Sequence, residues 1–184
     1  MRSFISLDVT NDDLMRSISS LQEMIVSQGA DVKIIMGKNI HFTLKFLGDI
    51  NPDNLDAIKE RLQRIKHERF SAEFKGLGVF PSNQRVSIIW IGIDKDSEQS
   101  IRNLSNQINE SLSGFDFREK KSFIPHLTIV RVKSEKNRDL LLRVIDEHSD
   151  HIFGKDSFSE FNLKKSILTP KGPIYTDLCS FKLE

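Results

Sequence analysis

The sequence predicts an α+β fold built from two similar lobes of antiparallel strands and helices, and three observations support this prediction. The tetrapeptide His-Phe-Thr-Leu at residues 41–44 returns as His-Leu-Thr-Ile at residues 126–129, 85 residues later. Two further landmarks recur at offsets of 88 and 89 residues: Phe70-Ser71 as Phe158-Ser159, and Phe80-Pro81 as Thr169-Pro170. After each tetrapeptide strand the predicted elements follow in the same order, namely helix, strand, proline turn and strand. A near-constant offset indicates an internal repeat, and this order disfavours a doubly wound parallel sheet.

Strands are predicted where apolar residues alternate with polar ones, or where β-branched and aromatic residues cluster. In the first half these segments are residues 2–9, 32–35 and 40–47, followed by 70–80 and 86–93. In the second half they are residues 123–132, 158–168 and 173–183. Gly76 and Gly78 lie within the segment 70–80 and permit a bulge there.

Helices are predicted where apolar residues recur every three or four positions after a capping residue. The first follows Asn11, and the second opens at residues 51–53, where a proline suits the first turn. The third covers residues 97–112, and the fourth follows Ser134, which is expected to cap it. The apolar faces comprise Leu14, Ile18, Leu21 and Ile25 in the first helix, Leu55, Ile58, Leu62 and Ile65 in the second, Ile101, Leu104 and Ile108 in the third, and Leu140, Leu141, Val144 and Ile145 in the fourth.

The composition is that of a globular chain of 184 residues, with 38% hydrophobic and 29% charged residues. A net charge of +1 argues against a broad nucleic-acid coat but permits a small phosphate ligand. Cys179 is the only cysteine, which excludes an internal disulfide and a thiolate zinc site. The sequence shows no signal peptide and no apolar run of the roughly 20 residues that span a bilayer. We therefore expect one domain over residues 1–184, in a soluble, cytoplasmic protein.

Each tetrapeptide places a histidine two residues before a threonine, so both side chains share one face of an extended strand. Histidine transfers protons near neutral pH because its unperturbed pKa is about 6.5. Two imidazoles on opposite sides of a substrate suit a reaction that needs a base on one side and an acid on the other. Cleavage of a phosphodiester fits, since a base activates the incoming oxygen and an acid protonates the leaving one. The threonine hydroxyls would donate hydrogen bonds to the phosphate oxygens.

Cations for a phosphate must come from neighbours of these strands. Lys45 shares the face of His41 and Thr43 by parity. Arg131 lies five residues after His126, which is the opposite parity in a flat strand. It reaches the site only if the strand twists, bulges or ends there, so parity alone does not select it.

Metal catalysis is the rival chemistry. Neither tetrapeptide has a neighbouring carboxylate or a further histidine to complete a zinc or two-metal site. His67 is expected to be solvated late in a polar helix, and His148 and His151 are expected past a helix end, where cationic histidines favour the dipole. For lack of such ligands we expect no metal, and because no phosphate-binding glycine loop occurs, nothing implies a nucleotide cofactor.

The chain resembles the 2H phosphoesterase superfamily, specifically the RNA 2′,3′-cyclic phosphodiesterases long called 2′-5′ RNA ligases. The resemblance covers almost the whole chain. It rests on five segments: Arg2-Ser3-Phe4-Ile5-Ser6-Leu7, residues 41–48, Phe80-Pro81-Ser82, residues 125–132 and Gly172-Pro173-Ile174-Tyr175. It implies a bilobal α+β fold with pseudo-twofold symmetry, in which both motifs line a central cleft.

The resemblance also implies metal-independent opening of a 2′,3′-cyclic phosphate at an RNA end to a 2′-phosphomonoester, with weak, reversible 2′-5′ ligation. It maps His41 and His126 as catalytic and Thr43, Thr128 and Arg131 as substrate-binding. We take His126 as the base that activates water and His41 as the acid, although pseudo-symmetry permits the reverse. The expected partner is an RNA with a 2′,3′-cyclic phosphate end, either tRNA-like or a small oligonucleotide. We expect a monomer with no membrane partner.

Two alternatives remain open at this stage. The first is a phosphodiesterase acting on another small cyclic or 2′-5′-linked nucleotide, and the second is a non-catalytic module that binds RNA ends. Further RNA contacts would come from basic side chains: Lys33, Lys38, Arg85, Lys120, Lys121 and Lys171.

Overall fold

The computed structural model describes residues 1–117, 123–170 and 172–184. The helices in this part of the chain are α1 (Asp12–Ser27), α2 (Leu55–Gln63), α3 (Lys95–Ser111) and α4 (Arg138–Glu147), with short 3-10 turns at Gly37–Asn39 and Pro52–Asn54. The strands are β1 (Arg2–Asp8), β2 (Val32–Ile34), β3 (His41–Asp49), β4 (Phe70–Ser82), β5 (Arg85–Ile93), β6 (Leu127–Val132), β7 (Ile152–Phe158), β8 (Glu160–Thr169) and β9 (Gly172–Lys182).

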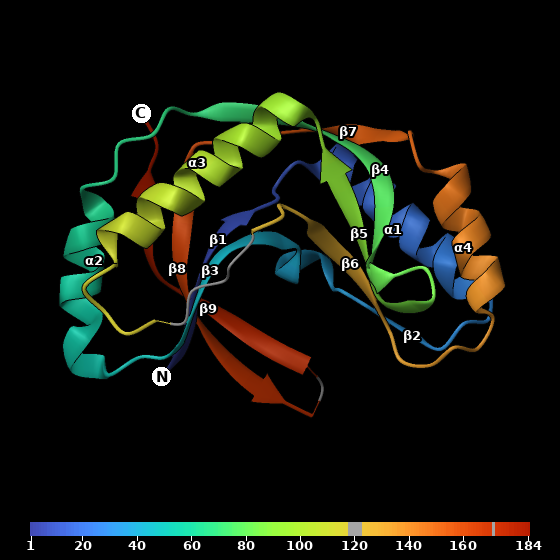
Figure 1. The fold of residues 1–184 in the computed structure, drawn as a ribbon, viewed down its shortest axis with the longest axis horizontal. Coiled ribbons are helices and arrows are strands. Elements are labelled where there is room, and N and C mark those ends of the chain that lie inside the picture. The colour runs from blue at the N-terminus through green and yellow to red at the C-terminus, as the bar shows by residue number, and fades with distance from the viewer. Residues whose placement is uncertain (118–122, 171) are drawn as a thin grey trace.

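The strands form two antiparallel sheets, which confirms the predicted α+β class. The four-stranded sheet has the order β3-β1-β8-β9, and the five-stranded sheet has the order β2-β6-β5-β4-β7. Strand β3, which carries the first tetrapeptide, pairs with β1. Strand β6, which carries most of the second, pairs with β5. In each half a long helix, α1 or α3, lies between the two paired strands in the sequence. Figure 1 shows α2 and α3 on one side of the molecule and α1 and α4 on the other, with strands between them.

The two halves of the chain exchange helices. α1 follows β1 of the four-stranded sheet but packs against β6 and β7 of the five-stranded sheet. In the opposite direction, α3 follows β5 of the five-stranded sheet but packs against β3 as well as β4. The apolar faces predicted for these helices are buried, and a single cluster of buried side chains joins both sheets.

Strand β4 contains a bulge at one of the two glycines that permit it. The pairing of β4 with β5 shifts register between Lys75 and Leu77, and Gly76 at this point has φ = +74°. A side chain there would also meet the backbone of Ser149, since a Cβ would lie 2.5 Å from its carbonyl oxygen. Both the conformation and the space therefore require glycine at this position.

The sequence predictions about this fold fail at several places. Strand β7 was not predicted, because Gly154 and two charged residues interrupt its apolar pattern. Phe158 ends β7 and pairs with Phe70, so it does not open the following strand, which begins at Glu160. The fourth helix begins after Asn137, whose φ of 56° lets the chain turn into it, and not at Ser134. Among the helices that the structure describes, none is long and apolar enough to cross a membrane.

Candidate active site

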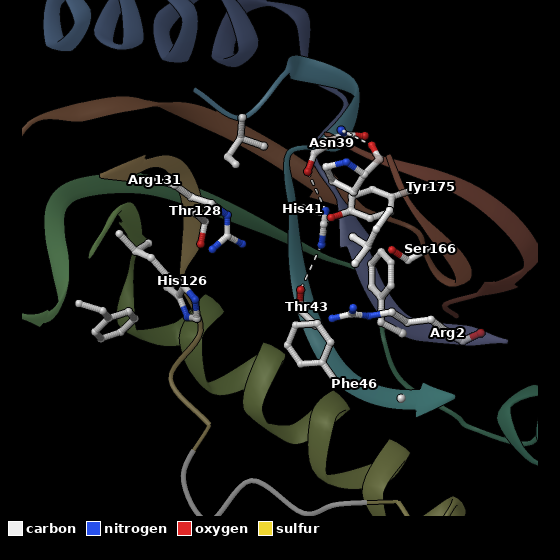
Figure 2. Close-up of a pocket in the computed structure, with 18 of the residues that line it drawn as sticks. Arg2, Asn39, His41, Thr43, Phe46, His126, Thr128, Arg131, Ser166 and Tyr175 are labelled. Atoms are coloured by element: carbon white, nitrogen blue, oxygen red, sulfur yellow. Dashed lines mark hydrogen bonds between the residues drawn. The ribbon is translucent and has the colours of Figure 1, made fainter. Parts of the chain in front are cut away.

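A cavity of about 780 Å³ lies between the two sheets, and the five residues predicted as catalytic or substrate-binding line it. His41 and Thr43 reach it from β3, while His126, Thr128 and Arg131 reach it from the segment around β6. Figure 2 shows the two groups on opposite sides of this cavity. His126 itself lies one residue before β6, because this strand begins at Leu127 and not at residue 123.

The hydrogen bonds of His41 define its tautomer. Its Nδ1 atom lies 2.8 Å from the carbonyl oxygen of Asn39, so Nδ1 carries the hydrogen and donates it. In the neutral ring, Nε2 then accepts a hydrogen bond from the Thr43 hydroxyl at 3.0 Å. The proton that His41 can gain or lose in the cavity is therefore the one on Nε2.

His126 has the same arrangement on the other side. Its Nδ1 atom lies 2.7 Å from the carbonyl oxygen of Ile124, again two residues earlier in the chain. Its ring packs edge-on against Phe80, with the ring centroids 4.9 Å apart. Phe80 in turn lies 5.2 Å from Trp90, whose indole covers Gly78 so closely that a Cβ would meet it at 2.1 Å. Both histidines thus present Nε2 for proton transfer.

Burial lowers the pKa of His41, because the charged imidazolium is poorly solvated there. The hydrogen bond to the Asn39 carbonyl and the negative charge of Asp8 oppose this effect, whereas Lys164 and Arg131 add to it. In the free protein His41 is therefore mainly neutral near pH 7.

A buried group of polar side chains lies behind His41. Asp8 is the cross-strand partner of His41 in the pairing of β1 with β3. Its carboxylate accepts hydrogen bonds from Ser6 at 2.9 Å and Asn162 at 3.1 Å, and it lies 2.6 Å from the Lys164 ammonium. Burial lowers the pKa of Lys164, but the carboxylates of Asp177 and Asp8 outweigh it and raise the pKa overall. This group fixes a negative charge beside the His41 ring.

A bulge in β3 overturns the parity argument for Lys45. Ser6 pairs with Thr43 and Ile5 pairs with Lys45, so Leu44 is an extra residue in the ladder. After the bulge the side chains change faces: Lys45 is 9% exposed and its Nζ lies 2.5 Å from Asn109 Oδ1. Phe46, at 50% exposure, lines the cavity in its place.

The equivalent bulge in β6 brings Arg131 into the cavity. Trp90 pairs with Thr128 and Ile89 pairs with Val130, so Ile129 is the extra residue. Arg131 consequently shares the cavity face with Thr128, although a flat strand would turn it away. Parity failed for both strands because a bulge follows each threonine.

A buried polar side chain from the exchanged helix contacts each bulge. Gln22 of α1 donates hydrogen bonds to the carbonyl oxygens of Ile35 at 2.8 Å and Ile129 at 2.9 Å. Ser105 of α3 donates a hydrogen bond to the carbonyl oxygen of Leu44 at 3.0 Å. Each helix thus anchors the backbone carbonyl of the extra residue in one bulge, and in β6 this bond adds to the one that the Ile129 carbonyl accepts from the Ile35 amide.

Several cavity residues were not predicted from the sequence, among them Arg2, Phe46 and Tyr175. Tyr175, the only tyrosine in the chain, packs edge-on against His41 with the centroids 5.4 Å apart. Burial raises the pKa of its hydroxyl, while the charges of Arg131 and Arg2 act in the opposite direction. Tyr175 and Arg2 could have been found from the sequence, because both lie in segments that resemble the family.

The other candidate residues that the structure describes do not line this cavity. Lys33, Lys38 and Arg85 lie outside its lining, and Lys120, Lys121 and Lys171 lie outside the described residues. His67 follows α2 and does not belong to it, and both its ring nitrogens face carbonyl oxygens. Within the ranges described, no group of three or more His, Cys, Asp or Glu side chains is placed to hold a metal ion.

Comparison with known proteins identifies the family. The family described as AKAP7 2'5' RNA ligase-like domain matches residues 2–183. The chain belongs to the 2H phosphoesterases. Two relatives of this 2H phosphoesterase are named RNA 2',3'-cyclic phosphodiesterase. The protein of Methanothermobacter thermautotrophicus is 34% identical over 100% of this chain and 99% of its own, and that of Archaeoglobus fulgidus is 36% identical over 99% and 100%.

Solved structures show the same fold. The crystal structure of Escherichia coli LigT in apo form aligns with a TM-score of 0.78 at 20% identity, covering 99% of this 2H phosphoesterase and 96% of LigT. A protein of Thermus thermophilus aligns with a TM-score of 0.79 at 23% identity, covering 99% and 97% of the two chains.

Proposed function

We propose that this 2H phosphoesterase hydrolyses the 2′,3′-cyclic phosphate at an RNA end to a 2′-phosphomonoester. The observation that carries the proposal is the pair of histidine–threonine sets on opposite sides of one cavity, each with its histidine Nδ1 bound to a backbone carbonyl. The names of relatives that align along the whole chain support this substrate.

In the proposed reaction a water oxygen attacks phosphorus, and the bond from phosphorus to the 3′-oxygen breaks. Nε2 of His126 accepts the proton of the water, and Nε2 of His41 donates a proton to the 3′-oxygen. Thr43, Thr128 and Arg131 would bind the non-bridging oxygens, where charge accumulates in the transition state. Although burial lowers the pKa of His41, an anionic phosphate in the cavity would favour its protonated form. The matching Nδ1 contacts of the two histidines also permit the reverse assignment.

The same site would support weak 2′-5′ ligation, with a 5′-hydroxyl attacking the cyclic phosphate in place of water. Neither reaction as proposed requires a metal ion, because the two imidazoles supply the acid and the base. Exposed Phe46 on the cavity wall would stack on the terminal base.

The direct test is incubation with an RNA that ends in a 2′,3′-cyclic phosphate, followed by identification of the product isomer. We expect the 2′-phosphomonoester, at a rate that EDTA leaves unchanged. His41→Ala and His126→Ala should each lower kcat by roughly 10²- to 10⁴-fold, because each removes a proton-transfer group. His151→Ala, outside the cavity lining, serves as the control.

Each alternative predicts a different result. Binding of the RNA without turnover would indicate a binding module, and turnover only of other cyclic or 2′-5′-linked nucleotides would indicate a different substrate. Full activity in either cavity variant would refute the two-histidine mechanism, and loss of activity in EDTA would indicate a metal.

We also infer that residues 1–184 work as a single domain with an internal repeat. The exchange of α1 and α3 between the sheets, and the one buried cluster that joins them, support this inference. It predicts that fluorescence of Trp90, the only tryptophan, and far-UV circular dichroism report one coincident urea transition. Two separated transitions would refute it.

A further inference from the structure

Arg2 is a second arginine of the cavity, and the proposed reaction does not use it. It begins β1, has an exposed side chain and lines the same cavity as Arg131. Figure 2 shows its guanidinium directed into the cavity. Within the described parts of the chain, neither guanidinium makes a hydrogen bond or an ion pair with a protein group. Asp49, the cross-strand partner of Arg2, instead lies 3.6 Å from the amino group of Met1.

The register of β1 places the backbone of Arg2 at some distance from Thr43. Ser6 is opposite Thr43, and Phe4 is opposite Phe46. Arg2, Phe4 and Ser6 alternate along β1 and so share one face, with Arg2 at the beginning of the strand. Four residues of strand correspond to roughly 13 Å. The backbone of Arg2 therefore lies beyond Phe4 and Phe46 as seen from Thr43, and the Arg2 side chain extends into the cavity from that end.

We propose that Arg2 binds the phosphodiester on the 5′ side of the terminal nucleotide. This inference rests on the proposed function. A 2′,3′-cyclic phosphate occupies the 3′ end of an RNA, so the next phosphate of the chain can lie only on the 5′ side of the same nucleoside. With the cyclic phosphate between the two histidines and the nucleoside against Phe46, that next phosphate falls at the Arg2 end of the cavity. The preferred substrate is consequently an oligonucleotide end and not a free nucleoside cyclic phosphate.

The test compares two small substrates that differ by a single phosphate: adenosine 2′,3′-cyclic phosphate and its 5′-phosphorylated derivative. The wild-type protein should hydrolyse the 5′-phosphorylated compound with a kcat/KM about three- to tenfold higher, the range expected for an exposed charge-assisted contact. Arg2→Gln should reduce this ratio to near one, and Arg2→Lys should keep part of it. Arg143→Gln, which removes an exposed arginine of α4 outside the cavity lining, should leave the ratio unchanged.

The outcomes separate this inference from the function on which it rests. Hydrolysis of both compounds at equal kcat/KM by the wild-type protein, or an unchanged ratio in Arg2→Gln, overturns the role of Arg2 and leaves the proposed function standing. Failure of the wild-type protein to hydrolyse either compound, or an RNA with the same end, overturns both. A ratio that falls only in the Arg2 variants, and that salt reduces in the wild-type protein, supports the assignment.

Discussion

Replacing Gln22 with methionine tests whether the bulge in β6 directs Arg131 into the cavity. Methionine has a similar length but no hydrogen-bond donor, so Gln22→Met removes the two bonds to the carbonyls of Ile35 and Ile129. Gln22 is 6% exposed, so water does not readily replace these bonds. At roughly 0.5–1.5 kcal/mol for each bond, the free energy of unfolding should fall by about 1–3 kcal/mol. Urea denaturation measures this loss.

The kinetic consequence is specific to Arg131. The Ile129 carbonyl keeps its bond from the Ile35 amide at 2.9 Å, so we expect the bulge to loosen without disappearing. A poorly directed Arg131 would lose part of the proposed contact with the phosphate, so kcat/KM should fall several-fold. In a double-mutant cycle with Arg131→Gln, the second substitution should add little, because both remove the same contact.

Ser105→Ala is the matched control, since it removes the bond to the bulge in β3 and leaves that in β6 intact. It should destabilise the fold by about 0.5–1.5 kcal/mol, and its effect on kcat/KM should be additive with that of Arg131→Gln. If Gln22→Met lowers stability but its kinetic effect is fully additive with that of Arg131→Gln, then Gln22 does not act through Arg131 and the reasoning is refuted.

Three further predictions concern single residues. Arg131→Gln should lower kcat/KM by about 10- to 100-fold, and Arg131→Lys should lower it less, because lysine keeps the positive charge. The urea midpoint of both variants should be unchanged, because the Arg131 side chain is exposed. Asp8→Asn removes a charge that raises the pKa of His41, so one limb of the pH profile of kcat/KM should move to lower pH: the acidic limb if His41 is the base, the alkaline limb if it is the acid. An unmoved profile would show that Asp8 does not influence the reaction. Gly78→Ala should displace Trp90, lower the free energy of unfolding by about 1–3 kcal/mol and reduce kcat, and an unchanged melting temperature would contradict the close packing.

Much of the fold follows from local sequence patterns. Alternating and helical periodicities predicted all four helices and eight of the nine strands that the structure describes. Strand β7 escaped because its pattern is broken by Gly154, which has a φ of 149°, by the exposed Lys155 and by the charged but buried Asp156. Its place beside β4 depends on pairing between distant segments, which periodicity does not reveal.

The repeated tetrapeptide predicted the core of the site, because i and i+2 positions share a face whatever the tertiary structure. The residues beyond each threonine were not predictable in this way. One extra residue in a strand reverses the faces, and which residue is extra depends on the partner strands and on Gln22 and Ser105 from the exchanged helices. Only the family resemblance indicated Arg131, and nothing local indicated that Phe46 would replace Lys45.

The two bulges have a consequence for the direction in which a substrate can lie. Both expose the residue five positions after the histidine, which is Phe46 in one half and Arg131 in the other. A site with identical halves would accept a substrate in two opposed orientations and would assign neither histidine a fixed task. Here the bulge exposes an apolar ring in one half and a cation in the other, so the nucleoside and cyclic phosphate of the proposed substrate would fit only one way round. Exchanging the two residues, in a Phe46→Arg, Arg131→Phe variant, would be expected to turn the substrate end for end and to interchange the donor and the acceptor of the proton.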